Sequence, residues 1–207
     1  MIRILLVDDH PIVRQGIRYI LTNRMAAVTI GEAADAAGGL QQVRTAQWDV
    51  VVLDITLPGQ SGLDLLKQFR QERPTLPVVV LSMHSATQFA ARVLRAGAKA
   101  YVVKDTAPMD LISAIEGVMR GQRFVSGGAI GGFGKGGART AHDALSDREY
   151  QVLRMLGSGR RVSEIGNVLG LSVKTVSTYR ARVLEKLGMT TNAELMRYAI
   201  ENELLDS

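Results

Sequence analysis

One short stretch constrains the fold of this chain more than any other. Residues 50–53, Val-Val-Val-Leu, are four consecutive apolar residues, three of them β-branched, and Asp54 follows them directly. Such a run is typical of a strand buried on both faces, as in a parallel sheet. Pro58 and Gly59 then indicate a loop. Because ligands bind beyond the carboxyl ends of parallel strands, Asp54 lies where folds of this kind place their chemistry.

Strand and helix patterns alternate over about the first 120 residues. Apolar segments with the length of strands occupy residues 2–7, 28–33, 50–53, 78–81 and 100–103. Each is followed by a helical pattern, at residues 11–22, 36–47, 61–72, 86–96 and 110–120. This order predicts a doubly wound α/β domain with a five-stranded parallel sheet and helices on both of its faces.

Polar residues end four of these strands. Asp8 and Asp9 follow the first strand, Asp54 the third, Ser82 the fourth and Lys104 the fifth. In a parallel sheet these side chains meet at one edge. Grouped carboxylates suit Mg²⁺, whereas an ammonium and a hydroxyl suit phosphoryl oxygens. Each residue alone has an ordinary structural explanation, such as helix capping by Asp9, but together they favour a site.

The composition excludes several classes of protein. The 207 residues are 46% hydrophobic and include no cysteine, which removes disulfides and thiolate chemistry and fits a reducing compartment. No apolar run approaches the roughly 20 residues that a membrane span requires. The first residues have neither the length nor the flanks of a signal peptide. We expect a cytoplasmic protein without membrane contact.

Positive charge is concentrated in the second half of the chain. Residues 154–186 contain seven basic and two acidic side chains, so this segment carries a net charge of +5, equal to that of the whole chain. Clustered positive charge is typical of proteins that bind polyanions. A solvated helical face is the alternative explanation.

A glycine-rich stretch separates the two halves. Residues 126–137 read SGGAIGGFGKGG, a composition that indicates a linker and not a packed element. It does not fit a phosphate-binding loop, because no strand leads into it and no Gly-Lys-Ser/Thr follows. The expected organisation is a first domain at 1–121, a linker at 122–143 and a second domain at 144–207.

The second domain has a wholly helical pattern. Ser146 and Glu149 have the spacing of a capping box. A short helix beginning at Ser163 is separated by Gly170 from a longer one at 173–187, and a last helix begins near Asn192. Two helices joined by a tight glycine-containing turn predict a helix-turn-helix within an all-α, four-helix domain.

The first 120 residues resemble the receiver domain of two-component response regulators. The resemblance rests on Asp8-Asp9, Asp54, Leu57-Pro58-Gly59, residues 61–64 (Ser-Gly-Leu-Asp), Ser82, Tyr101 and Lys104. It implies that Asp54 accepts a phosphoryl group and that Lys104 pairs with the phosphoryl oxygens. It further implies that Mg²⁺ is held by Asp8, Asp9, Asp54 and the backbone carbonyl of Thr56. Ser82 and Tyr101 would be the switch pair that relays phosphorylation.

Residues 144–205 resemble the DNA-binding domain of NarL/FixJ (LuxR-type) regulators. The motifs are residues 145–149 (LSDRE), 171–176 (LSVKTV) and 186–188 (KLG), with Tyr179 where many relatives have histidine. On the 173–187 helix, Val176, Val183 and Leu187 are expected to face the core. The residues expected to face DNA are Lys174, Thr175, Ser177, Thr178, Arg182 and Lys186.

These patterns favour a phosphorylation-dependent transcription regulator that is not an enzyme. Its expected partners are a sensor histidine kinase, double-stranded DNA and, when phosphorylated, a second copy of the chain. An aspartyl phosphatase is an alternative, but it would need an acid two residues after the nucleophile, where Thr56 stands. Another alternative is a DNA-binding protein whose acidic site is regulated by protein contacts instead of phosphate. The presence of all three acids and the lysine disfavours this alternative.

Overall fold

The computed structural model describes residues 1–58, 60–83, 89–127, 141–202 and 204–205. The chain divides into two compact units, Met1–Gly134 and Lys135–Ser207. Most of the expected glycine-rich linker, residues 128–140, lies outside the described residues, as does Gly59. Within the described ranges, the helices are all too short or too polar to cross a bilayer.

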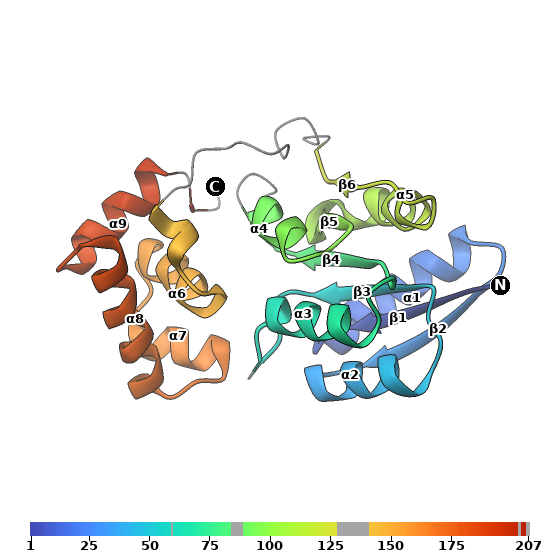
Figure 1. Ribbon diagram of the computed structural model, residues 1–207, viewed down its shortest axis with the longest axis horizontal. Helices are drawn as coiled ribbons and strands as arrows, with labels where there is room; N and C mark the ends of the chain where they lie inside the picture. The colour runs from blue at the N-terminus through green and yellow to red at the C-terminus, as the bar shows by residue number, and fades with distance from the viewer. Residues whose placement is uncertain (59, 84–88, 128–140, 203, 206–207) are drawn as a thin grey trace. The chain divides into compact units, whose positions relative to one another are not determined.

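A parallel sheet forms the centre of the first unit (Figure 1). Its strands are β1 (Ile2–Val7), β2 (Val28–Ala33), β3 (Val50–Asp54), β4 (Val78–Ser82), β5 (Ala100–Val103) and β6 (Phe124–Val125). They lie in the order β2-β1-β3-β4-β5-β6, and every neighbouring pair is parallel. The five predicted strands and the doubly wound class are confirmed. The sheet also has a sixth strand that was not predicted. This two-residue strand, β6, lies in the segment expected to be linker.

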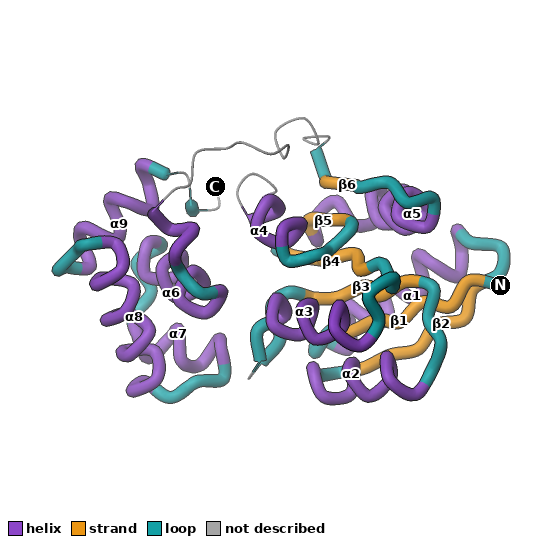
Figure 2. Tube along the Cα trace, viewed as in Figure 1, coloured by secondary structure: helices purple, strands orange, loops and turns teal. Residues whose placement is uncertain are grey.

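Helices cover both faces of this sheet (Figures 1 and 2). They are α1 (Pro11–Arg24), α2 (Ala36–Thr45), α3 (Gly62–Glu72), α4 (Phe89–Arg95) and α5 (Ala107–Met119), with a 3₁₀ turn, η1, at Lys104–Thr106. The helix expected at 86–96 corresponds to α4, but residues 86–88 are not described. Strand and helix bounds otherwise agree with the expected ranges to within about three residues at each end.

Side chains of the strands alternate between two cores. On one face, Ile4, Val52 and Leu81 belong to a buried cluster with residues of α1 and α5. On the other face, Val7 lies against Gly39 of α2, whose added Cβ would be 3.1 Å from a Val7 methyl. Because both faces are covered, each central strand is an uninterrupted apolar run. The polar residues that end these runs are therefore left at the carboxyl edge of the sheet.

The second unit consists of helices around a small apolar core. It contains α6 (Asp147–Gly157), α7 (Val162–Leu169), α8 (Val173–Leu187) and α9 (Asn192–Glu201), preceded by a 3₁₀ turn, η3, at Ala141–Ala144. The predicted capping box is present, with the Ser146 side chain accepting from Glu149 N and the Glu149 carboxylate accepting from Ser146 N. Val176 and Val183 are fully buried as expected, whereas Leu187 is half-buried. The all-α class of this domain is confirmed.

Candidate functional site

The ends of three strands bring two acids and a lysine together. Lys104 Nζ donates to Asp54 Oδ2 at 2.7 Å and to Asp8 Oδ2 at 2.9 Å. The two carboxyl groups come from the ends of β1 and β3, and the ammonium follows β5, 96 residues after Asp8 and 50 residues after Asp54. Asp8 and Asp54 are 2% and 1% exposed. The predicted convergence at one edge of the sheet is therefore present in the structure.

Burial and charge act against each other in this cluster. Burial raises the pKa of Asp54 to about 6, although Lys104 and the Thr56 backbone N–H act to lower it. For Lys104, burial acts to lower the pKa, but the charges and hydrogen bonds of Asp54 and Asp8 outweigh burial and raise it. At neutral pH, Lys104 is therefore a cation and Asp54 is mostly an anion. This state leaves Asp54 able to act as a nucleophile.

The acidic cluster has the composition of a site for a hard divalent cation. One ligand atom from each of Asp8, Asp9, His10 and Asp54 lies within 4.8 Å of the others. Asp9 Oδ1 is enclosed, and although His10 Nδ1 lies 3.0 Å away, it accepts no hydrogen bond of normal geometry within the described chain. The formal charges of the three carboxylates and the Lys104 ammonium sum to −2, which a divalent cation would neutralise. Oxygen ligands of this kind fit Mg²⁺.

His10 is a neighbour that the sequence analysis did not include in the cluster. Its Nδ1 lies 3.0 Å from Asp9 Oδ1 and 3.3 Å from Asp8 Oδ1, and its side chain is 62% exposed. Its backbone N–H also donates to Asp8 Oδ1 at 2.7 Å. Adjacency to two acids was the only signal available in the sequence, since an exposed histidine before a helix has no distinctive pattern.

The loop after β3 is folded back onto the end of that strand. Thr56 N donates to Asp54 Oδ1 at 2.9 Å, and Gly62 N donates to Ile55 O at 3.2 Å. A Cβ at position 62 would lie 2.6 Å from both Cα and O of Ile55, so only glycine permits this approach. The close packing of α3 against the loop holds the Thr56 backbone beside the Asp54 carboxylate.

Ser82 lies on β4, the strand next to that of Asp54, and Tyr101 lies on β5, one strand further. Leu81 is opposite Asp54 in the β3–β4 register, so Ser82 is one residue beyond it, at the carboxyl end of β4. Tyr101 is opposite Val80 in the β4–β5 register. Both side chains are completely buried. The structure thus shows Tyr101 in an inward position, and its role with Ser82 as a switch pair stays a prediction.

Ser126 ties the end of the first unit to β5, a connection that the sequence analysis missed. Ser126 N donates to Tyr101 O at 2.9 Å, and Ser126 Oγ accepts from Val103 N at 3.1 Å. Its hydroxyl also lies 3.2 Å from the Thr106 hydroxyl. Because Ser126 opens a glycine-rich stretch, its sequence context indicates a linker. Only the pairing of β6 with β5 reveals this contact.

In the second unit, α7 and α8 form the expected helix-turn-helix. α7 ends at Gly170, whose φ of 64° is the left-handed conformation that glycine adopts easily. Gly166 permits a close turn, because a Cβ there would lie 2.7 Å from Leu171 O. The Ser172 side chain then caps α8 by accepting from Thr175 N at 3.1 Å. The turn fixes the direction of α8 relative to α7.

The residues predicted to contact DNA divide into two groups. Lys174, Ser177, Thr178 and Arg182 are exposed on α8. Thr175 is half-buried, and its hydroxyl lies 2.8 Å from that of Ser172 within the helix cap. Lys186 Nζ is 2.6 Å from Glu149 Oε2. Although burial acts to raise the pKa of Glu149, hydrogen bonds from Lys186 and Ser146 outweigh it and lower that pKa.

One member of the basic segment is a core residue. Arg154 is only 9% exposed, and its Nε donates to Leu204 O at 2.6 Å. It therefore anchors the end of the chain to α6 and adds little to the surface charge. The sequence count of seven bases overstates the positive face, because charge and spacing cannot distinguish a buried arginine from an exposed one.

The fold and the two sites define a class of protein. A parallel α/β unit with a cluster of acids and a lysine at its sheet edge, together with a helix-turn-helix unit, is the architecture of a DNA-binding response regulator. The response regulator receiver domain family matches residues 4–116, and the luxR family of bacterial regulatory proteins matches residues 143–199. The chain therefore belongs to the two-component response regulators of the NarL/FixJ class, with a LuxR-type DNA-binding domain.

Known relatives match over nearly the whole length. Response regulator UvrY of Escherichia coli K12 is 34% identical, covering 100% of this chain and 97% of the relative. Response regulator GacA of Pseudomonas aeruginosa is 34% identical, covering 100% and 99%. Among solved structures, RcsB of Salmonella enterica serovar Typhimurium, bound to promoter rprA in the presence of phosphomimetic BeF3−, is 30% identical with a TM-score of 0.66, covering 96% and 98%.

Proposed function

We propose that this response regulator binds DNA under the control of phosphorylation at Asp54. The observation that carries the proposal is the Lys104 ammonium bound between the buried carboxylates of Asp54 and Asp8. These three charged groups come from three strand ends, at the edge of the sheet where ligands bind. The arrangement suits a group that carries negative charge onto Asp54.

The chemistry would be attack of an Asp54 carboxylate oxygen on the phosphorus of a phosphodonor, with departure of the donor's leaving group. The pKa of about 6 keeps Asp54 ionised at neutral pH, as a nucleophile requires. Lys104 already donates to Asp54 Oδ2 and would transfer this hydrogen bond to a phosphoryl oxygen. Phosphoryl transfer depends mainly on such positioning and charge stabilisation.

Mg²⁺ fits the same pocket. The carboxylates of Asp8, Asp9 and Asp54, with the backbone carbonyl of Thr56, would hold the ion. When bound, it supplies positive charge that offsets the repulsion between the carboxylate and the phosphodonor. The clustering of these carboxylate oxygens supports this assignment, as does the enclosed Asp9 Oδ1, whose polar neighbour is His10 Nδ1 at 3.0 Å.

Phosphorylation would replace one carboxylate charge by about −1.5 to −2 charges and add acceptor oxygens. Ser82, at the adjacent strand end, would donate to one of these oxygens, and Tyr101 would report the change from its buried position. Ser126 binds the β5 backbone at Tyr101 and Val103, immediately before Lys104. The receiver domain is therefore better taken as residues 1–126, with the output domain still at 144–207.

On the output domain, Lys174, Ser177, Thr178 and Arg182 would face the major groove. Thr175 and Lys186 would support this surface, since one belongs to the cap of α8 and the other neutralises buried Glu149. One short helix binds DNA weakly, so phosphorylation would act by dimerising the protein. Two α8 helices would then meet half-sites about 34 Å apart. A sensor histidine kinase would supply the phosphoryl group.

Gel-shift titrations of the full-length protein test this proposal. The DNA would be a fragment selected from a random pool, with and without beryllofluoride and Mg²⁺. We expect the additives to tighten binding of the wild type and of Asp105→Asn, which removes an exposed carboxylate near the same edge. Asp54→Asn should not respond. Equal affinities with and without beryllofluoride for the wild type would contradict phosphorylation control.

A further inference from the structure

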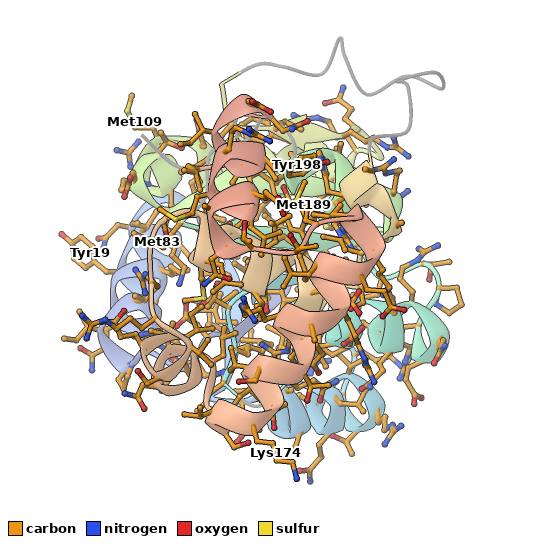
Figure 3. The ribbon with its side chains drawn as sticks, turned by 90° about the vertical axis from the view of Figure 1, so that its left-hand side faces the viewer. Tyr19, Met83, Met109, Lys174, Met189 and Tyr198 are labelled. Carbon is orange, nitrogen blue, oxygen red and sulfur yellow. The ribbon has the colours of Figure 1, made fainter. Side chains whose placement is uncertain are left out.

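The exposed face of α8 has small side chains between two cations, and the predicted DNA contacts do not say what these small side chains recognise. Exposed side chains recur at positions 174, 177, 178, 181, 182 and 185, the spacing of one helical face. Lys174 lies at the first turn and Arg182 two turns later. Figure 3 shows Lys174 at the end of α8, with its side chain extending away from the helices. Between these two cations the face presents only small side chains.

The polar group of Thr178 is already used within the helix. Its Oγ1 donates to Lys174 O at 3.0 Å, the backbone carbonyl one turn earlier. The hydroxyl proton is thus used within the helix, so Thr178 offers a ligand its methyl group and, as an acceptor only, its hydroxyl oxygen. Ala181 follows three residues later on the same face and is exposed, so its Cβ adds a second methyl group beside the first.

Apolar patches of this size match one feature of the major groove. The C5-methyl group of thymine is the apolar group that a base pair presents there, and alanine and threonine methyls are side-chain groups that contact it. Lys174 lies four residues before Thr178 and Arg182 four residues after it, so one cation lies on each side of the two methyl groups. These cations would hold phosphates or guanine edges while the centre of the helix lies against the bases.

We propose that Thr178 and Ala181 read thymine through its C5-methyl group, and that Thr178 does so by its methyl and not its hydroxyl. This inference rests on the proposed DNA binding by α8 and adds the chemistry of base recognition. It requires that the selected half-sites contain thymine at the position under the centre of α8.

Substitution in the DNA tests the contact directly. The full-length protein, with beryllofluoride and Mg²⁺, would be titrated with its selected fragment and with fragments in which deoxyuridine replaces single thymidines. Deoxyuridine lacks only the C5-methyl group. Loss of one buried methyl contact should weaken binding about fourfold at each contacted thymine. Thymines outside the half-sites should be insensitive to the replacement.

Two variants separate the methyl from the hydroxyl. Thr178→Ser keeps the hydroxyl but removes the methyl from both half-sites of the dimer, so it should weaken binding of thymine DNA about sixteenfold, and the further loss on deoxyuridine DNA should be smaller than for the wild type. Thr178→Val keeps a methyl at the same position and should keep the wild-type sensitivity to deoxyuridine. Thr45→Ser is the matched control, because Thr45 is an exposed helical threonine whose hydroxyl also donates to a carbonyl four residues earlier, in α2.

The outcomes distinguish this inference from the function on which it rests. Selected half-sites without thymine, or wild-type affinity unchanged by deoxyuridine at every half-site position, would overturn methyl recognition while DNA binding stands. Weak binding by Thr178→Val combined with normal binding by Thr178→Ser would assign the contact to the hydroxyl instead. If the wild type selects no DNA at all, the proposed function fails together with this inference.

Discussion

The buried carboxyl group of Asp54 should make the receiver less stable as the pH rises. The pKa of Asp54 is about 6 in the folded chain, compared with 3.8 for an ordinary aspartate. A raised folded-state pKa contributes stability that is present below pH 3.8 and lost as the pH rises through about 6. Two pKa units correspond to about 3 kcal/mol of unfolding free energy, of which about 2 kcal/mol falls between pH 4.5 and 7.5.

Asp54→Asn removes this ionisation and isolates its effect. Relative to Asp54→Asn, the wild type should lose about 2 kcal/mol of unfolding free energy between pH 4.5 and 7.5 without added metal. The assay is urea unfolding followed by fluorescence of Trp48, the only tryptophan of the chain. Trp48 lies in the receiver, where its indole donates to Gln42 O and Arg3 lies over its ring.

The control for this measurement is Asp105→Asn, which removes an equal charge from an exposed position. This variant should follow the wild-type pH dependence. Parallel pH profiles for the wild type and Asp54→Asn would refute the reasoning, because the Asp54 carboxyl would then ionise at the same pH in the folded and unfolded chains. The reasoning would also be refuted if the unfolding free energy of the wild type rose with pH relative to that of Asp54→Asn, because the pKa of Asp54 would then be lowered by folding.

Three further substitutions test other parts of the structure. Lys104→Met leaves Asp54 without its counterion and should cost about 3–5 kcal/mol of receiver stability at pH 7.5, and less below pH 6, by Trp48 unfolding. Gly166→Ala places a methyl against Leu171 O and should lower the stability of the helical unit by about 1–3 kcal/mol, seen as a lower melting temperature by circular dichroism. Lys174→Ala should reduce the slope of log affinity against log salt by about 1.8, which is about 0.9 for one phosphate contact in each half-site of the dimer; an unchanged slope would remove that contact.

Much of the molecule could be predicted from local patterns. Apolar runs ended by acids, a hydroxyl or a lysine predict both the parallel sheet and its polar edge, because the carboxyl ends of parallel strands must meet. The capping residues Ser146 and Glu149 and the turn at Gly170 are equally local. They act on backbone groups within a few residues, so their sequence spacing contains the geometry.

Contacts between distant segments could not be predicted in this way. The pairing of β6 with β5 depends on the edge that β5 leaves open, and the contacts of Ser126 follow from that pairing. Arg154 and Lys186 read as surface charge, yet one binds Leu204 O and the other binds Glu149. Sequence periodicity assigns each side chain a face of its own helix. It does not say what another segment, dozens of residues away, will place on that face.

The sequence by itself determined the two kinds of domain and the residues that gather at the sheet edge, because buried strands and helix caps are encoded by neighbouring residues. Tertiary structure alone decided which charges are free for ligands and which are used internally. The difference arises because the energy of a charge depends on its burial and its partners, and both are supplied by segments far away in the chain.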